Sequence, residues 1–147
     1  MFADMAKTLG APAATVSTAS KAAPADTFVT ILPHLTIQSR EKVEAAIKGF
    51  WAKMSTESEP KCLFYGFTIS EDGTKLHCRE AYDDADAALF HLKHIDEELK
   101  VLTADGCAKL DSFEIHGPAS ELEKLKEPLK DISPSYFVTQ QGGFWRK

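Results

Sequence analysis

Two histidines, a glutamate and a tyrosine are the residues whose types and spacing could do chemistry. His91 and His94 stand three residues apart in the stretch HCREAYDDADAALFHLKH, and Glu80 and Tyr82 precede them in it. A carboxylate beside an imidazole forms a general acid–base pair, but the same arrangement also occurs as a satisfied ion pair in a protein core. The sequence therefore allows both a catalytic and a structural interpretation of these residues.

A histidine pair with this spacing can also chelate a metal ion. Glu98 lies about one helical turn beyond the pair, so a trio of ligands is conceivable. No CxxC motif accompanies it, and we expect neither a bound metal nor a cofactor. The cysteines are odd in number and widely spaced, which predicts reduced thiols without a catalytic role. They are Cys62, Cys78 and Cys107.

The chain around these residues alternates between strand and helix patterns. A segment rich in β-branched residues predicts the first strand, and Ser39 is a suitable N-cap for the helix after it. An Asp-Gly turn joins two further strands as a hairpin. A long helix opens at Asp83 or Asp84 and continues to about Thr103. The predicted strands are 27–37, 61–70, 75–82, 109–117 and 135–141, and the predicted helices are 39–54, about 84–103 and 118–131.

This order of elements predicts an α+β fold. The first six elements match the ferredoxin-like βαββαβ unit, an antiparallel sheet with both helices on one face, and an extra C-terminal αβ follows. Residues 1–26 are rich in Ala, Ser, Thr and Pro and predict a flexible tail before a domain at 27–147. One face of the sheet is left bare, and a second copy of the chain is its simplest cover, so we expect a homodimer.

Strand alternation assigns side chains to the two faces of the sheet. In the first strand, Val29, Ile31 and Leu35 share an apolar face suited to the core, while His34 points to the dimer or pocket side. In the third strand, Arg79 and Glu80 point to opposite faces, and Glu80 lies in an apolar layer if it shares the face of Cys78 and Tyr82. A carboxylate inside an apolar layer needs a partner, and His91 or Tyr65 is available.

Composition excludes several classes of function. The net charge is −5 and no basic residues cluster along a face, so we expect no nucleic-acid binding. No run approaches ~18 apolar residues, so we expect no membrane insertion. Residues 1–26 contain no arginine and no continuous apolar segment, unlike a transit peptide or a secretory signal. These features favour a cytoplasmic protein.

The stretch CREAYDDADAALFHLKH resembles the antibiotic-biosynthesis-monooxygenase-like proteins of the dimeric α/β-barrel group. Glu80, Tyr82, Ala87 and His91 fall on positions that these proteins share. The resemblance implies a barrel of two subunits, with a pocket between the sheet and the helices. It also implies cofactor-independent oxidation of a quinol- or anthrone-like substrate by O2. The chain contains no asparagine, a residue that the oxygenases and the haem-degrading branch use, and this is a departure from the pattern.

Two functional hypotheses follow. In the first, the protein is a monooxygenase in which His91 removes a proton from a small aromatic substrate, with Glu80 and Tyr82 as further catalytic residues. In the second, it is a non-catalytic homodimer that binds a small apolar ligand or a protein partner. The residues expected to contact the substrate are His34, Tyr65, Phe90 and His94.

Overall fold

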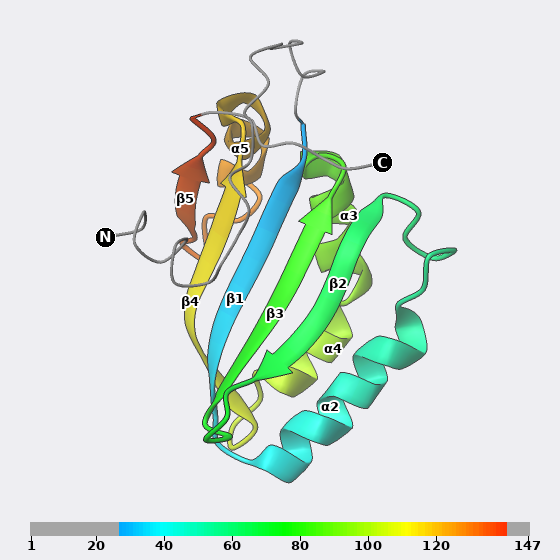
Figure 1. Cartoon of the computed structure of the whole chain (residues 1–147), viewed down its shortest axis with the longest axis vertical. Helices are drawn as coiled ribbons and strands as arrows, with labels where there is room; N and C mark the ends of the chain where they lie inside the picture. Colours follow the sequence, from blue (N-terminus) through cyan, green and yellow to red (C-terminus); the bar gives the residue numbers. More distant parts are fainter. Residues whose placement is uncertain (1–26, 141–147) are drawn as a thin grey trace, which may run out of the picture.

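A five-stranded sheet with helices on one face makes up residues 27–140, the part of the chain that the computed structural model describes (Figure 1). The tail predicted at 1–26 lies outside the described residues. The elements in chain order are β1 (Val29–Ile37), α2 (Arg40–Lys53), β2 (Cys62–Ile69), β3 (Lys75–Tyr82), α3 (Ala85–His94), α4 (Asp96–Leu102), β4 (Ala108–Gly117), α5 (Ala119–Lys126) and β5 (Ser135–Val138).

The strand order is β2-β3-β1-β4-β5. The first four strands pair in antiparallel fashion, which is the predicted ferredoxin-like unit. The added strand β5 pairs with β4 in parallel, so the complete sheet is mixed. This direction follows from the connection, because α5 crosses over and returns the chain to the same end of the sheet. The predicted α+β class is confirmed.

Local signals in the sequence account for the element boundaries. The Ser39 side chain accepts a hydrogen bond from the backbone N–H of Lys42 at the start of α2, at 3.4 Å. Gly73 has a φ of 75°, which the turn between β2 and β3 requires and which L side chains rarely adopt. Asp84 caps α3 by accepting from the N–H of Ala87 at 2.8 Å.

The long helix predicted from Asp83 or Asp84 to about Thr103 is in fact two helices, and this prediction was wrong. α3 ends at His94, and Ile95 separates it from α4. Apolar residues continue at helical spacing across the break, so the sequence pattern does not reveal it. The new helix starts with the acidic residues Asp96, Glu97 and Glu98, which suit the partial positive charge of a helix N-terminus.

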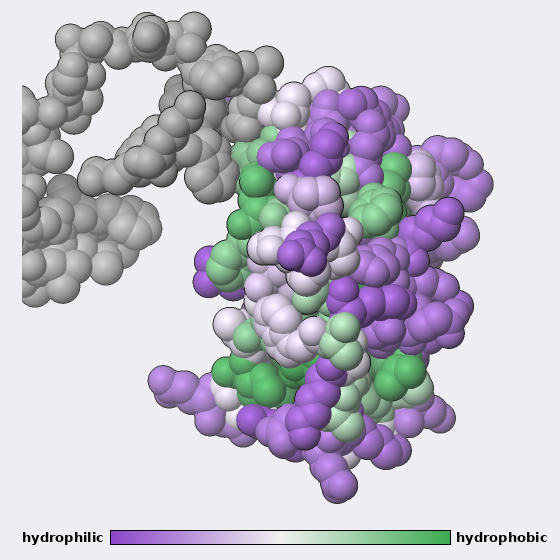
Figure 2. Space-filling model, turned by 90° about the vertical axis from the view of Figure 1, so that its right-hand side faces the viewer, coloured by the Kyte–Doolittle hydropathy of each residue, from purple (hydrophilic) through white to green (hydrophobic). Residues whose placement is uncertain are grey.

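The hydrophobic core lies between the sheet and its helices, with α3 and α4 running behind the strands in Figure 1. Val29, Ile31 and Leu35 of β1 face this core, as strand alternation predicted. The opposite face of the sheet has no covering element among the described residues. Figure 2, seen from the edge that carries β2 and α2, shows apolar side chains in separate areas between polar ones.

A search of residues 27–140 finds no helix long and apolar enough to cross a membrane.

Candidate acid–base site

Two carboxylates and two imidazoles meet where β3, α3 and the loop before β2 come together. The Nδ1 atom of His91 lies 2.8 Å from Oε2 of Glu59, and its Nε2 atom lies 3.6 Å from Oε2 of Glu80. The Nδ1 atom of His94 lies 2.7 Å from Oε1 of Glu59. We call Glu80, His91, Glu59 and His94 the acid–base cluster.

Glu59 occupies the loop between α2 and β2, and its side chain is 2% exposed. The loop is held in place by its own hydrogen bonds. The backbone N–H of Glu59 donates to the carbonyl of Ser55, and the carbonyl of Glu59 accepts from the N–H of Cys62, both at 3.0 Å. A carboxylate in a loop is usually solvated, so its burial here requires the two histidines as partners. The sequence analysis did not single out Glu59.

His91 is fully buried on the inner face of α3. Its ring lies between two tyrosines, with centroids 5.0 Å from Tyr65 and 5.1 Å from Tyr82. Because the oxygens of Glu59 accept hydrogen bonds, the proton of a neutral His91 lies on Nδ1. Its Nε2 atom then carries a lone pair, is buried and has no hydrogen-bond partner among the described residues.

Glu80 is the titrating group of the cluster. Its carboxylate accepts a hydrogen bond from the Tyr82 hydroxyl at 2.9 Å. Burial raises the pKa of Glu80 to about 7, against the lowering effect of hydrogen bonds from Tyr82 and Cys78, and the charge of Glu59 raises it further. At neutral pH the carboxyl group is therefore divided between its acid and base forms.

His91, Tyr65, Tyr82 and Cys78, which lie near Glu80, stay neutral at pH 7. Burial lowers the pKa of His91 below its usual value, although Glu59 acts in the opposite direction. Burial also raises the pKa values of the Tyr65 and Tyr82 phenols and of the Cys78 thiol well above their usual ranges. Both tyrosines are consequently hydrogen-bond donors at every physiological pH, and Cys78 is not a nucleophile.

An apolar cavity of about 230 Å³ lies between the sheet and the helices, next to Glu80. Glu80 is the only charged residue among those that line it, so the cavity favours an uncharged and mostly apolar molecule. Glu80 and Tyr65 contribute its polar groups beside Cys78 and Thr103, whereas His91 does not line it. The residue that would meet a bound molecule is thus Glu80, and His91 stands behind it. The remaining lining residues are Pro33, Leu35, Phe50, Phe67, Ile95, Leu99, Leu102, Leu110, Phe113 and Ile132.

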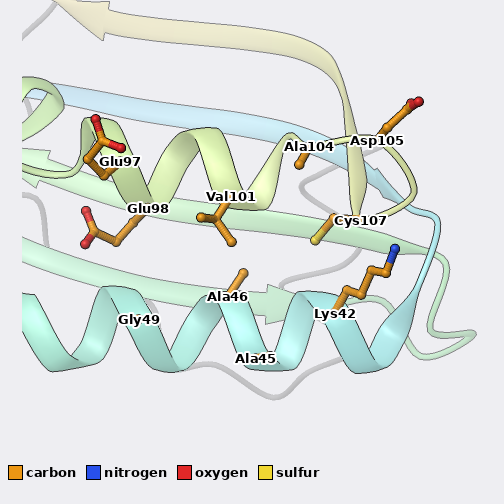
Figure 3. A pocket seen from close by; sticks show the side chains of 10 residues that line it. All are labelled: Lys42, Ala45, Ala46, Gly49, Glu97, Glu98, Val101, Ala104, Asp105 and Cys107. Carbon is orange, nitrogen blue, oxygen red and sulfur yellow. The ribbon is translucent and has the colours of Figure 1, made fainter.

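A larger groove of about 530 Å³ lies between α2 and α4 (Figure 3). Small residues, Ala45, Ala46 and Gly49, line it on the α2 side. Of its carboxylates, Glu98 is already paired with Lys53 at 2.8 Å. None of the buried, unpartnered side-chain atoms of residues 27–140 belongs to its lining residues. The smaller cavity is therefore the better candidate site, because a buried titrating group lines it.

The structure brings together some of the predicted site residues and separates others. Glu80, Tyr82, His91, Tyr65 and His94 all lie in or beside the acid–base cluster. The ring of Phe90 is 55% exposed and contacts only His94 of this group, at 5.8 Å between centroids.

His34 lies on the opposite face of the sheet, where its Nδ1 atom is 3.1 Å from Nε2 of His77. Because alternate side chains of β1 face opposite sides, it cannot reach the cavity from there.

The conceivable metal trio is not assembled, because the carboxylate of Glu98 is bound to Lys53 instead of approaching the histidines. Within residues 27–140, no group of three or more His, Cys, Asp and Glu side chains is arranged to hold a metal ion.

The structural class of the protein follows from its fold. It has the ferredoxin-like α+β fold found in SnoaB, a cofactor-independent oxygenase from Streptomyces nogalater. The two chains are 14% identical and superpose with a TM-score of 0.51, over 60% of this chain and 90% of SnoaB. A conserved protein of Bacteroides thetaiotaomicron, described as a possible oxidoreductase, is 15% identical with a TM-score of 0.51, over 62% of this chain and 97% of its own. These two likenesses establish the fold, and the predicted resemblance to antibiotic-biosynthesis-monooxygenase-like proteins holds at that level.

A nearer relationship defines the family. This chain is 37% identical to MupZ from Pseudomonas fluorescens and superposes on its crystal structure with a TM-score of 0.72, over 84% of this chain and 93% of MupZ. The chain belongs to the same family as MupZ. No family model matches the sequence, and no curated protein matches it.

Proposed function

We propose that the protein is an acid–base catalyst acting on a small, uncharged, mostly apolar molecule, and that its reaction is cofactor-independent oxygenation of a weakly acidic aromatic. The observation that carries this proposal is the position of Glu80. It is a buried carboxyl group with a pKa of about 7 at the edge of an apolar cavity. A proton acceptor with a pKa near the working pH is the most effective general base.

In the proposed reaction, the carboxylate of Glu80 removes a proton from an activated C–H group of the bound substrate. Tyr65, which lines the same cavity, remains a phenol and donates a hydrogen bond to the substrate oxygen on which negative charge develops. The electron-rich substrate anion then reduces O2 directly.

The atoms of this reaction balance without a bound metal or flavin. In an anthrone, the methylene carbon loses both of its hydrogens and gains one oxygen atom of O2 as a ketone. The second oxygen atom leaves with the two hydrogens as water. The carbon is oxidised by four electrons, and O2 accepts all four.

This proposal gives the role of proton acceptor to Glu80, whereas the sequence led us to expect His91 in that role. Since His91 does not line the cavity, its role in the proposal is to position Glu80 and to exchange protons with it. Tyr82 donates a hydrogen bond to Glu80 and holds the carboxylate in place. The oxygenase SnoaB supports the proposed chemistry only through the fold that it shares with this chain.

The second half of the proposal is a homodimer. The open face of the sheet carries partly exposed aromatic rings, with Phe64 50% exposed and Phe137 46% exposed. The Arg79 guanidinium lies over the Phe64 ring at 5.4 Å from its centroid. An uncovered sheet face with such residues favours a second copy as its cover. A native mass spectrum tests this directly: a dimer supports the barrel arrangement, and a monomer overturns it.

The enzymatic proposal is tested with anthrone as the probe, because it is uncharged and is a carbon acid. We expect the wild-type protein to consume O2 and form anthraquinone faster than the buffer alone, and Glu80→Gln to lose the effect. Glu114→Gln is the control, since Glu114 lies on the open face of the sheet beside His34. Deuterium incorporation into anthrone without O2 measures proton removal separately.

Each outcome decides between the hypotheses. Enzyme-dependent O2 uptake supports the oxygenase. Deuterium incorporation without O2 uptake supports proton transfer at Glu80 and overturns the oxygenase. Anthrone that binds, as seen by quenching of aromatic fluorescence, without either reaction favours the non-catalytic ligand-binding homodimer. If anthrone neither binds nor reacts, anthrone-like molecules are excluded as the substrate class.

A further inference from the structure

The members of the acid–base cluster form a continuous row that leads from the cavity to the protein surface. Glu80 lines the cavity, His91 lies between Glu80 and Glu59, and Glu59 contacts His94. The side chains become more exposed at the far end of the row. His91 is 0% exposed and Glu59 is 2% exposed, whereas His94 is 24% exposed.

The inner end of the row has a gap at the point where a proton would pass. The distance of 3.6 Å between Nε2 of His91 and Oε2 of Glu80 is longer than a hydrogen bond. The Nε2 atom has no other partner among the described residues, although it is completely buried. An unpaired, buried nitrogen is costly, and the arrangement is relieved when Glu80 carries a proton to donate to it.

The outer part of the row is closely connected. Glu59 is within hydrogen-bond distance of Nδ1 of both histidines, at 2.8 Å and 2.7 Å. This carboxylate bridges two imidazoles. An ordinary ion pair joins one carboxylate to one cation, and a helix cap joins a side chain to backbone N–H groups. The Glu59 carboxylate is suited to pass a proton from one ring to the other, since each histidine can accept a proton on one nitrogen and release another from its second nitrogen.

We propose that Glu80, His91, Glu59 and His94 form a proton relay between the apolar cavity and solvent. A proton taken up by Glu80 moves to Nε2 of His91 as the Nδ1 proton of His91 moves to Glu59. Glu59 passes it to Nδ1 of His94 once His94 has exchanged its own Nδ1 proton for one on Nε2 through water, and His94 then releases the Nε2 proton to water and regains its Nδ1–H form. The reverse passage carries a proton back to Glu80 and returns His91 to its Nδ1–H tautomer. The outward passage moves one proton from the cavity to solvent.

The relay deepens the proposed function and rests on it, because a proton exported during substrate deprotonation must be replaced by one that re-enters for the product water, and the buried carboxyl group of Glu80 needs a path to solvent for both. The alternative exit is a surface depression of about 290 Å³ that Glu59 also borders, together with Lys61 and Phe90. A proton leaving through that depression would bypass His94, and the experiment separates these two routes.

The test uses the exchange of the His91 Nδ1 proton with solvent, measured by NMR on protein labelled with 15N-histidine, which requires no substrate. In His94→Gln the new amide can still donate to Glu59 but cannot carry a proton. We expect exchange at His91 to slow by roughly 10- to 100-fold, and added imidazole to restore part of the rate. His116→Gln is the matched control, because His116 is a partly exposed histidine on the other face of the sheet.

An unchanged exchange rate in His94→Gln overturns the relay through His94. If this variant does not fold, as judged by its circular dichroism spectrum, His94→Asn is measured in its place with the same expectation. Glu80→Gln should leave exchange at His91 within about twofold, because Glu80 lies on the inner side, but should abolish turnover of anthrone. A slowed exchange in His94→Gln together with no turnover by wild type would uphold the relay and overturn the proposed oxygenase.

Discussion

The two faces of the sheet each carry a cluster of histidines and carboxylates, and only one of them has the properties of a catalytic site. On the helix-covered face, Glu80 and Glu59 are buried with His91 beside an apolar cavity. On the open face, Glu114 approaches His34 at 3.5 Å and His116 at 3.6 Å, and these side chains remain partly exposed.

The difference lies in the environment of the groups and not in their chemistry. On the open face, the side chains of His34, Glu114 and His116 are 27%, 31% and 42% exposed. On the covered face, each charge must be balanced by a neighbour, and the pKa of Glu80 rises to about 7 as a result. Residue types that look equivalent in a sequence can therefore differ in the free energy that it costs to charge them.

The largest effect expected is on catalysis. Glu80→Gln preserves the shape of the side chain but removes its ability to accept a proton, so we expect the rate of anthrone oxidation to fall by about 10²- to 10⁴-fold. Glu114→Gln, the equivalent change on the open face, should leave the rate within about twofold. O2 uptake measured with a Clark electrode checks both variants, and equal losses in the two would contradict the assignment of the site to the covered face.

The next effect is on stability. Glu59→Ala leaves the Nδ1 atoms of His91 and His94 without their acceptor, one of them in a fully buried position. We expect the free energy of unfolding to fall by about 3 kcal/mol, because breaking a buried, charge-assisted network is strongly destabilising. Glu123→Ala, which removes an exposed ion-pair partner of Lys126, should cost less than about 1 kcal/mol. Urea denaturation at pH 7 measures the difference.

The pH dependence of stability should show the raised pKa of Glu80. Between pH 4.5 and about 7, Glu80 is protonated in the folded state but ionised in the unfolded state. The stabilisation that comes from this proton is therefore complete below pH 4.5 and is lost as the pH rises through about 7. His91, with a lowered pKa, contributes in the opposite sense, since its stabilisation is present above about pH 6.5 and is lost as the pH falls.

Comparison with Glu80→Gln isolates the carboxyl group, because His91 is present in both proteins. We expect the free energy of unfolding of wild type to fall relative to the glutamine variant by a few kcal/mol between pH 4.5 and 8. If the free energies of unfolding of the two proteins, measured by urea denaturation, changed in parallel with pH over this range, Glu80 would have the pKa of an ordinary glutamate. The groups that face Glu80 and set its pKa are Tyr82, Cys78 and Glu59.

The smallest effect expected is from Tyr82→Phe. The hydroxyl of Tyr82 donates to Glu80 and lowers the pKa of that carboxyl group, so its removal should raise this pKa by about one unit, the equivalent of a single hydrogen bond. Tyr136→Phe is the matched control, since its hydroxyl is buried without a hydrogen-bond partner among the described residues. A titration of the Glu80 side-chain carboxyl by 13C NMR reports the shift. A lower pKa in Tyr82→Phe would contradict the hydrogen-bond assignment.

Periodicity in the sequence was sufficient to predict the order of strands and helices along the chain and to limit Glu80 to one of two directions, inward if it shares the face of Cys78 and Tyr82. Alternation along β3 placed it among Cys78 and Tyr82, and both neighbours are buried. The same argument placed His34 on the face opposite the core, although it left open whether that face lined a pocket. These predictions succeed because strand geometry fixes which face a side chain occupies.

The same reasoning could not predict the burial of Glu59 or the break in the helix at Ile95. Glu59 lies in an irregular loop with no period, and its burial depends on the long-range approach of α3, 32 residues away at His91. The break leaves the apolar spacing intact, so a pattern of faces cannot distinguish one helix from two. The family resemblance implied a pocket between the sheet and the helices, but periodicity does not identify its walls, because they come from β1, α2, β2, β3, α4 and β4.

The break at Ile95 places the histidines of the acid–base cluster and two residues of the cavity wall on different helices. α3 carries His91 and His94, whereas Leu99 and Leu102 of α4 form part of the cavity wall. Each helix has its own hydrogen-bond ladder and its own N-terminal residues. Substitutions in α4 can therefore change the shape of the cavity without moving the imidazoles of His91 and His94. Changes in one short helix can thus alter which molecules fit the cavity while the residues of the proposed proton relay stay in place.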